Sequence, residues 1–229
     1  MNAVVITFPG SNREHDVCQA WQLATGREPA RIWHRDATLP DSDLIILPGG
    51  FAYGDYLRCG AMAAHSPIMR EVKARALRGT PVLGICNGFQ ILTEAGMLPG
   101  ALLPNRTLKF ICRDVHLRVE NSQTIFTCGY SAGQTIRVPT AHHDGSYTAD
   151  PATLDRLEDQ GLVAFRYCSP AGDLSDSDNV NGSARAIAGI FNASRTILGL
   201  MPHPENATDP LLGGTDGRAF FDGLVSALQ

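Results

Sequence analysis

The sequence lacks several features that mark specialised protein classes. It has no C-x-x-C pair, no apolar run of membrane-spanning length, and neither a Gly-x-x-x-x-Gly-Lys-Ser/Thr nor a Gly-x-Gly-x-x-Gly motif. Without paired cysteines, a zinc ribbon or a thioredoxin-type site is not expected. Without a long apolar run, a membrane helix is not expected. Without a glycine-rich phosphate loop, the chain is not expected to bind ATP itself.

An excess of positive charge is also missing. With 19 Lys and Arg against 23 Asp and Glu, the net charge is -4, which gives no reason to expect nucleic acid or an anionic membrane as a partner. A chain of 229 residues with 44% hydrophobic content buries a core without disulfides, so most of its 6 cysteines are expected to be reduced. A basic leader is not expected, because the first residues already form a strand-like apolar pattern. These features predict a cytoplasmic protein with one domain over residues 1–229 and no bound metal.

Short apolar runs alternate with helix-compatible segments, which predicts an α/β fold. Strands are predicted over Ala3–Phe8, Ala30–His34, Asp43–Leu47, Pro81–Ile85, Leu162–Cys168, Ala184–Phe191 and Ile197–Met201. Helices are predicted over Arg13–Thr25, Ala61–Leu77 with a break at Pro67, Phe89–Glu94, Pro151–Gln160 and Asp216–Leu228. Further strands without helices between them are predicted over Thr107–Ile111, Val115–Val119, Thr124–Thr127 and Thr135–Pro139. We therefore expect a doubly wound, mostly parallel sheet flanked by helices, with an antiparallel hairpin region in the middle of the chain.

One cysteine stands where a strand is predicted to turn into a helix. Cys86 follows the apolar run Pro81–Ile85, precedes the helical segment Phe89–Glu94, and lies between Gly84 and Gly88. Gly-x-Cys-x-Gly is the cysteine form of the elbow that exposes a nucleophile above a parallel sheet. The N-terminus of the following helix favours a thiolate over a thiol. A single cysteine in an apolar run can equally be an inert core residue, so the rest of the chain must decide.

His203 is the candidate base for this thiol. It follows the last predicted strand, just as Cys86 follows an earlier one, and Pro204 favours extended backbone at His203. Residues two apart in an extended chain project to the same side, so Glu205 is placed to orient the imidazole. A nucleophile, a base and an orienting group are the three parts that nucleophilic catalysis requires.

Backbone N–H groups can supply an oxyanion hole at the same edge of the sheet. Gly49 and Gly50 end a predicted strand and leave backbone donors unobstructed, and Asn87 is the residue directly after the proposed nucleophile. Gly50 and Asn87 are therefore the candidate oxyanion donors.

Taken together, these motifs resemble the class I glutamine amidotransferases. The motifs are Pro48-Gly49-Gly50, Gly84-Ile85-Cys86-Asn87-Gly88-Phe89-Gln90 and His203-Pro204-Glu205. Further segments are similar to the glutaminase subunits of phosphoribosylformylglycinamidine synthase, an enzyme of purine biosynthesis. They are Phe8-Pro9-Gly10-Ser11-Asn12, Gly50-Phe51-Ala52-Tyr53-Gly54-Asp55-Tyr56-Leu57-Arg58, Asn179-Val180-Asn181-Gly182-Ser183 and Ile187-Ala188-Gly189-Ile190. The family usually has Ala-His-x-Glu-Gly where this chain has Ala141-His142-His143-Asp144-Gly145. The family's loop geometry or partner contact at this segment is therefore not expected to carry over unchanged to this chain.

The resemblance implies a glutaminase whose triad is Cys86, His203 and Glu205. It also implies that Gln90 helps to hold the substrate glutamine, together with Gly49 and the segment Asn181, Gly182 and Ser183. No cofactor is expected in this chain, while ATP and magnesium are expected on a larger synthetase subunit that receives the ammonia. A small accessory subunit is a further expected partner.

Other protein classes fit the sequence less well. A cysteine phosphatase needs an Arg six residues after the nucleophile, where this chain has Leu92, and an α/β-hydrolase places its acid before its His. The related intracellular-protease-like proteins commonly have His directly after the Cys, where this chain has Asn87. A non-catalytic regulatory domain of the same fold would be expected to have lost a triad member, and all three are present.

Overall fold

A nine-stranded mixed sheet forms the centre of the protein. The computed structural model describes all residues 1–229, and the sheet has the order β2-β1-β3-β4-β11-β10-β9-β6-β7. Its strands are β1 (Ala3–Thr7), β2 (Ala30–Trp33), β3 (Leu44–Leu47), β4 (Val82–Ile85), β6 (Ile111–Val119), β7 (Thr135–His142), β9 (Val163–Cys168), β10 (Ile187–Phe191) and β11 (Ile197–Leu200). The short strands β5 (Ala101–Leu103) and β8 (Ser146–Thr148) pair separately.

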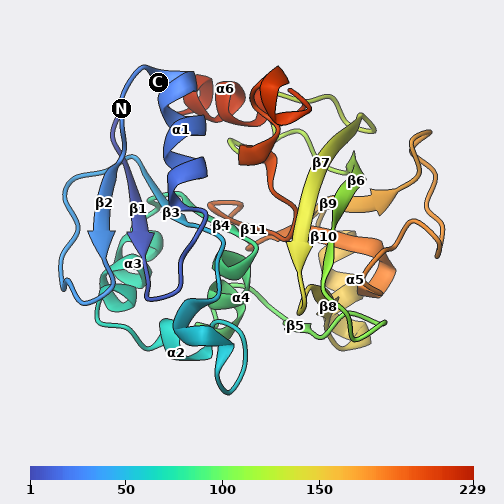
Figure 1. Ribbon diagram of the computed structural model, residues 1–229, viewed down its shortest axis with the longest axis horizontal. Coiled ribbons are helices and arrows are strands. Elements are labelled where there is room, and N and C mark those ends of the chain that lie inside the picture. Colours follow the sequence, from blue (N-terminus) through green and yellow to red (C-terminus); the bar gives the residue numbers. More distant parts are fainter.

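The sheet has a parallel half and an antiparallel half. Strands β2, β1, β3, β4 and β11 are parallel to one another, whereas β11, β10, β9, β6 and β7 pair antiparallel. The parallel strands β3, β4 and β11 are buried at every position, which explains their continuous apolar sequences. The predicted hairpin region therefore extends the main sheet, with β6 and β7 at one edge (Figure 1).

Helices pack against this sheet. They are α1 (Glu14–Thr25), α2 (Ala61–Ala64), α3 (Ile68–Leu77), α4 (Asn87–Glu94), α5 (Pro151–Asp159) and α6 (Arg218–Ala227). The predicted break at Pro67 is confirmed, since it separates α2 from α3. Helix α4 contacts β3, β4 and β11, and α1 contacts β1 and α6 (Figure 1). Short 3₁₀ helices follow β3 (Ala52–Asp55), precede β10 (Ala184–Ala186) and follow β11 (Pro204–Asn206 and Pro210–Leu212).

Two of the predicted strands are wrong. Thr107–Ile111 is mostly a turn, in which Leu108 has a left-handed backbone angle of φ 54° and Asn105 Nδ2 donates to the Lys109 carbonyl at 2.9 Å. Thr124–Thr127 is also a turn, closed by a 2.7 Å hydrogen bond between the two threonine hydroxyls. Both segments contain β-branched or apolar residues that favour strands, but local side-chain bonds fold them into turns.

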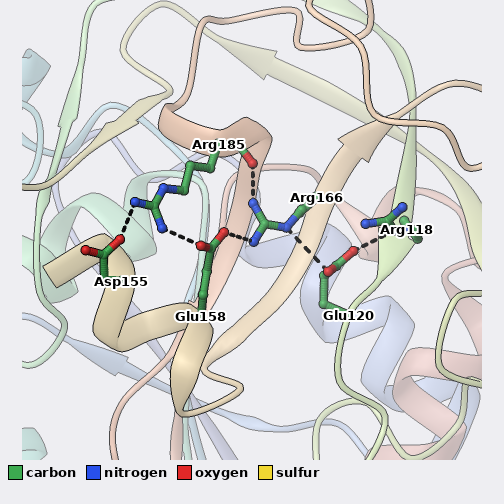
Figure 2. A network of polar contacts seen from close by, with 6 residues as sticks. All are labelled: Arg118, Glu120, Asp155, Glu158, Arg166 and Arg185. Atoms are coloured by element: carbon green, nitrogen blue, oxygen red, sulfur yellow. Dashed lines mark hydrogen bonds and ion pairs between the residues drawn. The ribbon is translucent and has the colours of Figure 1, made fainter. Parts of the chain in front are cut away.

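A network of ion pairs joins the antiparallel half to α5. Figure 2 shows Arg118, Glu120, Arg166, Glu158, Arg185 and Asp155 in one continuous chain of contacts. Arg166 is its centre: it contacts Glu158 at 2.5 Å and Glu120 at 3.4 Å, and it donates to the carbonyl of Arg185. Arg185 has a left-handed backbone (φ 53°), so the network braces a turn that a non-glycine residue adopts at a cost. This turn leads directly into β10.

Candidate active site

Cys86 occupies a strained turn between β4 and α4. Its backbone angles are φ 51° and ψ -105°, which L residues rarely adopt. A Cβ on Gly88 would lie 1.9 Å from the carbonyl oxygen of Leu47, and one on Gly84 would lie 2.5 Å from Cδ1 of Leu92. The turn therefore requires glycine at both flanking positions, as expected for a nucleophile elbow.

The Cys86 side chain is almost closed off from solvent. The residue is 5% exposed, and its thiol donates to the carbonyl oxygen of Ala141 at 3.7 Å. The Cys86 backbone N–H donates to Leu200 at 2.8 Å, which ties the elbow to the end of β11. The nucleophile is thus held between the two halves of the sheet.

His203 and Glu205 form a buried pair beside the elbow. His203 Nδ1 lies 2.7 Å from Glu205 Oε1, while His203 Nε2 makes no hydrogen bond. His203 is non-helical, with φ -109° and ψ 84°, and Pro204 then begins a 3₁₀ helix that includes Glu205. The expected extended geometry of the His-Pro-Glu segment is therefore wrong. The carboxylate reaches the imidazole from the first turn of that helix.

The charge of this pair is set by its surroundings. Burial alone would lower the pKa of His203, but the Glu205 carboxylate and the nearby Cys86 sulfur raise it above the usual histidine range. Glu205 is buried, and its Oε2 makes no hydrogen bond. The imidazole thus has one nitrogen fixed by a carboxylate and the other free, an arrangement suited to moving a proton.

The free edge of β7 forms one wall of the site. Because alternate residues of an edge strand direct their backbone groups away from the sheet, residues 137, 139 and 141 present theirs outward. Arg137 N–H donates to Asp216 Oδ2 at 2.7 Å, Pro139 accepts from His203 N–H at 2.8 Å, and Ala141 accepts from the Cys86 thiol. The edge strand thus contacts both the candidate base and the candidate nucleophile.

The two candidate oxyanion donors are available in the structure. Gly50 has φ 155°, and its N–H donates to no protein acceptor. Asn87 is the first residue of α4, so no helical carbonyl can accept from its N–H. The Asn87 side chain joins the two regions, since its Oδ1 accepts from Ala52 N–H at 3.1 Å.

Gln90 lies one turn after Cys86 and has both ends of its amide engaged. Its Oε1 accepts from Asn87 Nδ2 at 2.8 Å, and its Nε2 donates to the Asp144 carbonyl at 2.6 Å. Gln90 thus links the elbow to the segment that departs from the family pattern. To contact glutamine, its side chain would have to exchange one of these partners.

The segment Asn181 to Ser183 lies behind the turn at Gly145. Asn181 Nδ2 and Ser183 Oγ both donate to the Gly145 carbonyl, at 2.8 and 3.3 Å. Both residues are buried, and Gly182 packs on Arg106, where a Cβ would lie 2.8 Å from that of the arginine. These residues support the Gly145 turn, and direct contact with a substrate stays a prediction. Gly49 lies closer to the triad, since a Cβ there would be 2.9 Å from His203 Cε1.

A cavity of about 410 Å³ opens beside His203. It is bordered among others by Arg13, Pro139, Ala141, His203 and Asp216, whereas Cys86 does not line it. This volume is within the range of small-molecule sites, about 300–1,000 Å³. The sequence named Ala141 only as part of the segment that departs from the family pattern, and the structure places its carbonyl beside the Cys86 thiol. Asn105, which the sequence did not single out, binds the carbonyl of His142 in the same segment.

The chain holds no group of three or more His, Cys, Asp or Glu side chains arranged to bind a metal ion. None of its helices combines the length and the apolar character that a bilayer crossing requires.

Comparison with known proteins identifies the class to which this fold and site belong. Residues 1–213 match the CobB/CobQ-like glutamine amidotransferase domain, so the chain belongs to the glutamine amidotransferases. Solved structures of low identity show the same fold, such as a putative GMP synthase subunit from Thermoplasma acidophilum. It has a TM-score of 0.66 at 18% identity and covers 100% of this chain and 94% of its own.

More similar proteins define the particular family. The chain is 57% identical over 230 residues to phosphoribosylformylglycinamidine synthase subunit PurQ of Rhodospirillum rubrum, with 100% of both chains covered. It is 56% identical to that of Nitrobacter winogradskyi, with 100% and 99% covered. The structure of PurLQS from Thermotoga maritima matches with a TM-score of 0.88 at 44% identity, covering 100% of this chain and 99% of that one. The chain is thus a member of the PurQ family, the glutaminase subunits of phosphoribosylformylglycinamidine synthase in purine biosynthesis.

Proposed function

We propose that this chain hydrolyses glutamine to glutamate and ammonia through Cys86, His203 and Glu205. It would deliver the ammonia to an ATP-dependent synthetase subunit that makes phosphoribosylformylglycinamidine. The observation that carries the proposal is the state of His203: Nδ1 is fixed by Glu205 at 2.7 Å, and Nε2 is buried without a hydrogen bond beside the elbow. This is the arrangement that a base needs to accept a thiol proton.

The chemistry then follows from these positions. The Cys86 thiol breaks its hydrogen bond to the Ala141 carbonyl and gives its proton to His203 Nε2. The sulfur then attacks the side-chain amide carbon of glutamine. The N–H groups of Gly50 and Asn87 would stabilise the oxyanion. His203 returns the proton to the departing nitrogen, which leaves as ammonia. Water, deprotonated by His203, hydrolyses the thioester to glutamate and restores the thiol.

The surface beside Gly50 supports docking of a partner there. The loops that contain Phe51 and Phe110 meet with ring centroids 6.4 Å apart, and both rings are exposed. Tyr56, Leu57 and Leu108 on the same two loops are more than 70% exposed. Apolar groups gathered in this way mark interaction sites. Because the chain is similar to the PurLQS structure, the proposed partners are the larger synthetase subunit, which would hold ATP and magnesium, and a small accessory subunit.

Substitution of the nucleophile tests the proposal. In the enzyme assembled with its synthetase subunit, Cys86→Ala is expected to abolish glutamine-dependent synthesis and to leave ammonia-dependent synthesis unchanged. Cys112→Ala serves as the control, because Cys112 is an exposed cysteine on the border of the cavity. Glutamine use by Cys86→Ala at the wild-type rate would disprove the assignment.

A further inference from the structure

The segment Ala141–Gly145 closes the site on the side of β7. Two of its carbonyl oxygens face the proposed machinery: Ala141 accepts from the Cys86 thiol at 3.7 Å, and Asp144 accepts from Gln90 Nε2 at 2.6 Å. The position of this segment therefore determines where the Ala141 carbonyl lies relative to Cys86 and where the Asp144 carbonyl lies relative to Gln90.

Asn105 binds the remaining residues of the same segment. Its Nδ2 donates to the His142 carbonyl at 2.9 Å, its backbone N–H donates to the His143 carbonyl at 2.8 Å, and its Oδ1 accepts from Gly145 N–H at 3.2 Å. The residue is 0% exposed, and Nδ2 also donates to the Lys109 carbonyl. One buried residue thus fixes the three members of the segment that do not face Cys86 or Gln90.

We propose that Asn105 is a positioning residue for glutamine hydrolysis. It holds residues 142, 143 and 145, and through them it sets the carbonyl groups of Ala141 and Asp144 beside Cys86 and Gln90. This inference rests on the proposed glutaminase function and adds a residue that touches neither the thiol nor the triad.

Neighbouring contacts make this support rigid. Arg106 N–H donates to the Asn181 carbonyl at 2.9 Å, and Asn181 Nδ2 donates to the Gly145 carbonyl at 2.8 Å. The His142 ring lies directly on Gly145, where a Cβ would be 2.3 Å from its Cε1. The turn therefore cannot relax easily around a lost Asn105 bond, and the His142 carbonyl would lose the donor that Asn105 supplies.

The matched substitution is Asn105→Asp. It keeps the shape of the side chain but replaces both Nδ2 donors by an oxygen that repels the His142 and Lys109 carbonyls. In the assembled enzyme we expect kcat/KM for glutamine to fall about tenfold or more, mainly through KM, because a buried hydrogen bond is replaced by repulsion. Ammonia-dependent synthesis should not change. Asn121→Asp is the control, since Asn121 Nδ2 donates to the Gly161 carbonyl at 2.7 Å in a part of the chain that does not contact the site.

A labelling experiment separates positioning from a general loss of structure. A glutamine-like diazoketone and iodoacetamide both alkylate an accessible thiol, but only the first uses the substrate pocket. In Asn105→Asp, the rate of Cys86 labelling by the diazoketone is expected to fall about tenfold, the factor lost in kcat/KM, while labelling by iodoacetamide keeps its rate.

Two results would overturn the inference: a wild-type KM for glutamine in Asn105→Asp, or an equal fall in both labelling rates. If Asn105→Asp does not fold, Asn105→Ala, which removes the side-chain donors and the acceptor, is judged by the same criteria. Failure of the proposed function itself would be recognised separately, by glutamine use in Cys86→Ala.

Discussion

The thiol of Cys86 and the carbonyl oxygen of Ala141 lie 3.7 Å apart, which brings the end of β4 to the free edge of β7. In the sheet these two strands are separated by β11, β10, β9 and β6. Their contact means that the antiparallel half curves back over the carboxyl end of the parallel half. The elbow and the 3₁₀ helix with Glu205 follow parallel strands, whereas the wall that faces them comes from the edge hairpin.

Glu205→Gln is expected to move the alkaline limb of the glutaminase pH profile to lower pH. The carboxylate raises the pKa of His203, so the protonated imidazole persists to higher pH in the wild type than without it. Removal of the charge should shift the limb down by about one unit or more, the usual effect of an opposite charge at this distance. The measurement is kcat/KM for glutamine against pH. Glu71→Gln on α3 is the control, and an unchanged alkaline limb in Glu205→Gln would contradict the role of the pair.

Gly50→Ala is expected to lower glutamine turnover by about 10²–10³, the cost of one missing oxyanion donor. Gly50 has φ 155°, and a Cβ would lie 2.6 Å from the Cα of Ser11, so alanine must displace the backbone that carries the N–H. Gly79→Ala is the matched control, because Gly79 also has positive φ but its Cβ would meet nothing within 4 Å. If both variants lose only stability, and kcat is unchanged, Gly50 does not supply an oxyanion donor.

Arg166→Met is expected to destabilise the protein by about 2 kcal/mol, because a buried guanidinium loses its charged hydrogen bonds, while Glu120 keeps Arg118 and Glu158 keeps Arg185. The Arg166 side chain is 8% exposed, and those of Glu120 and Glu158 are 22% and 35% exposed. Chemical denaturation measures the change. Arg218→Met, which breaks an exposed pair with Asp222, should cost less than about 1 kcal/mol. Equal losses in the two variants would show that the network in Figure 2 acts only as a set of surface pairs.

His142 is expected to make the protein sensitive to acid. Burial, helped by the nearby His203, lowers its pKa from 6.5 to about 4, and neither ring nitrogen has a hydrogen-bond partner. Between these values the unfolded chain binds a proton that the folded chain does not, so stability falls as pH drops from 6.5 towards 4, by up to about 3 kcal/mol. His142→Leu should therefore lose less stability than the wild type between pH 7.5 and 4.5. The exposed His65→Leu should behave like the wild type, and identical pH dependence in all three proteins would refute the prediction.

Local sequence patterns identified the residues whose roles depend on their immediate neighbours. The elbow at Cys86 is visible in its two glycines, and the pairing of His203 with Glu205 in the spacing around Pro204. The role of Asn105 depends on contacts with residues 37 to 40 positions away, and no local pattern indicates it. The wrong strand at Thr107–Ile111 has a different cause: the bond from Asn105 to the Lys109 carbonyl is local, but strand propensity does not take such a side-chain bond into account.

Because β7 lies at the edge of the sheet, the chain can accept insertions and deletions at some positions but not at others. Deletion of a single residue between Thr135 and Pro139 would turn the outward backbone groups at positions 139 and 141 towards β6. The anchor of the His203 backbone and the acceptor for the Cys86 thiol would be lost together. Insertions in the exposed turn over residues 131–134 would leave both in place. Among related chains, variation in length should therefore concentrate in that turn and spare the strand itself.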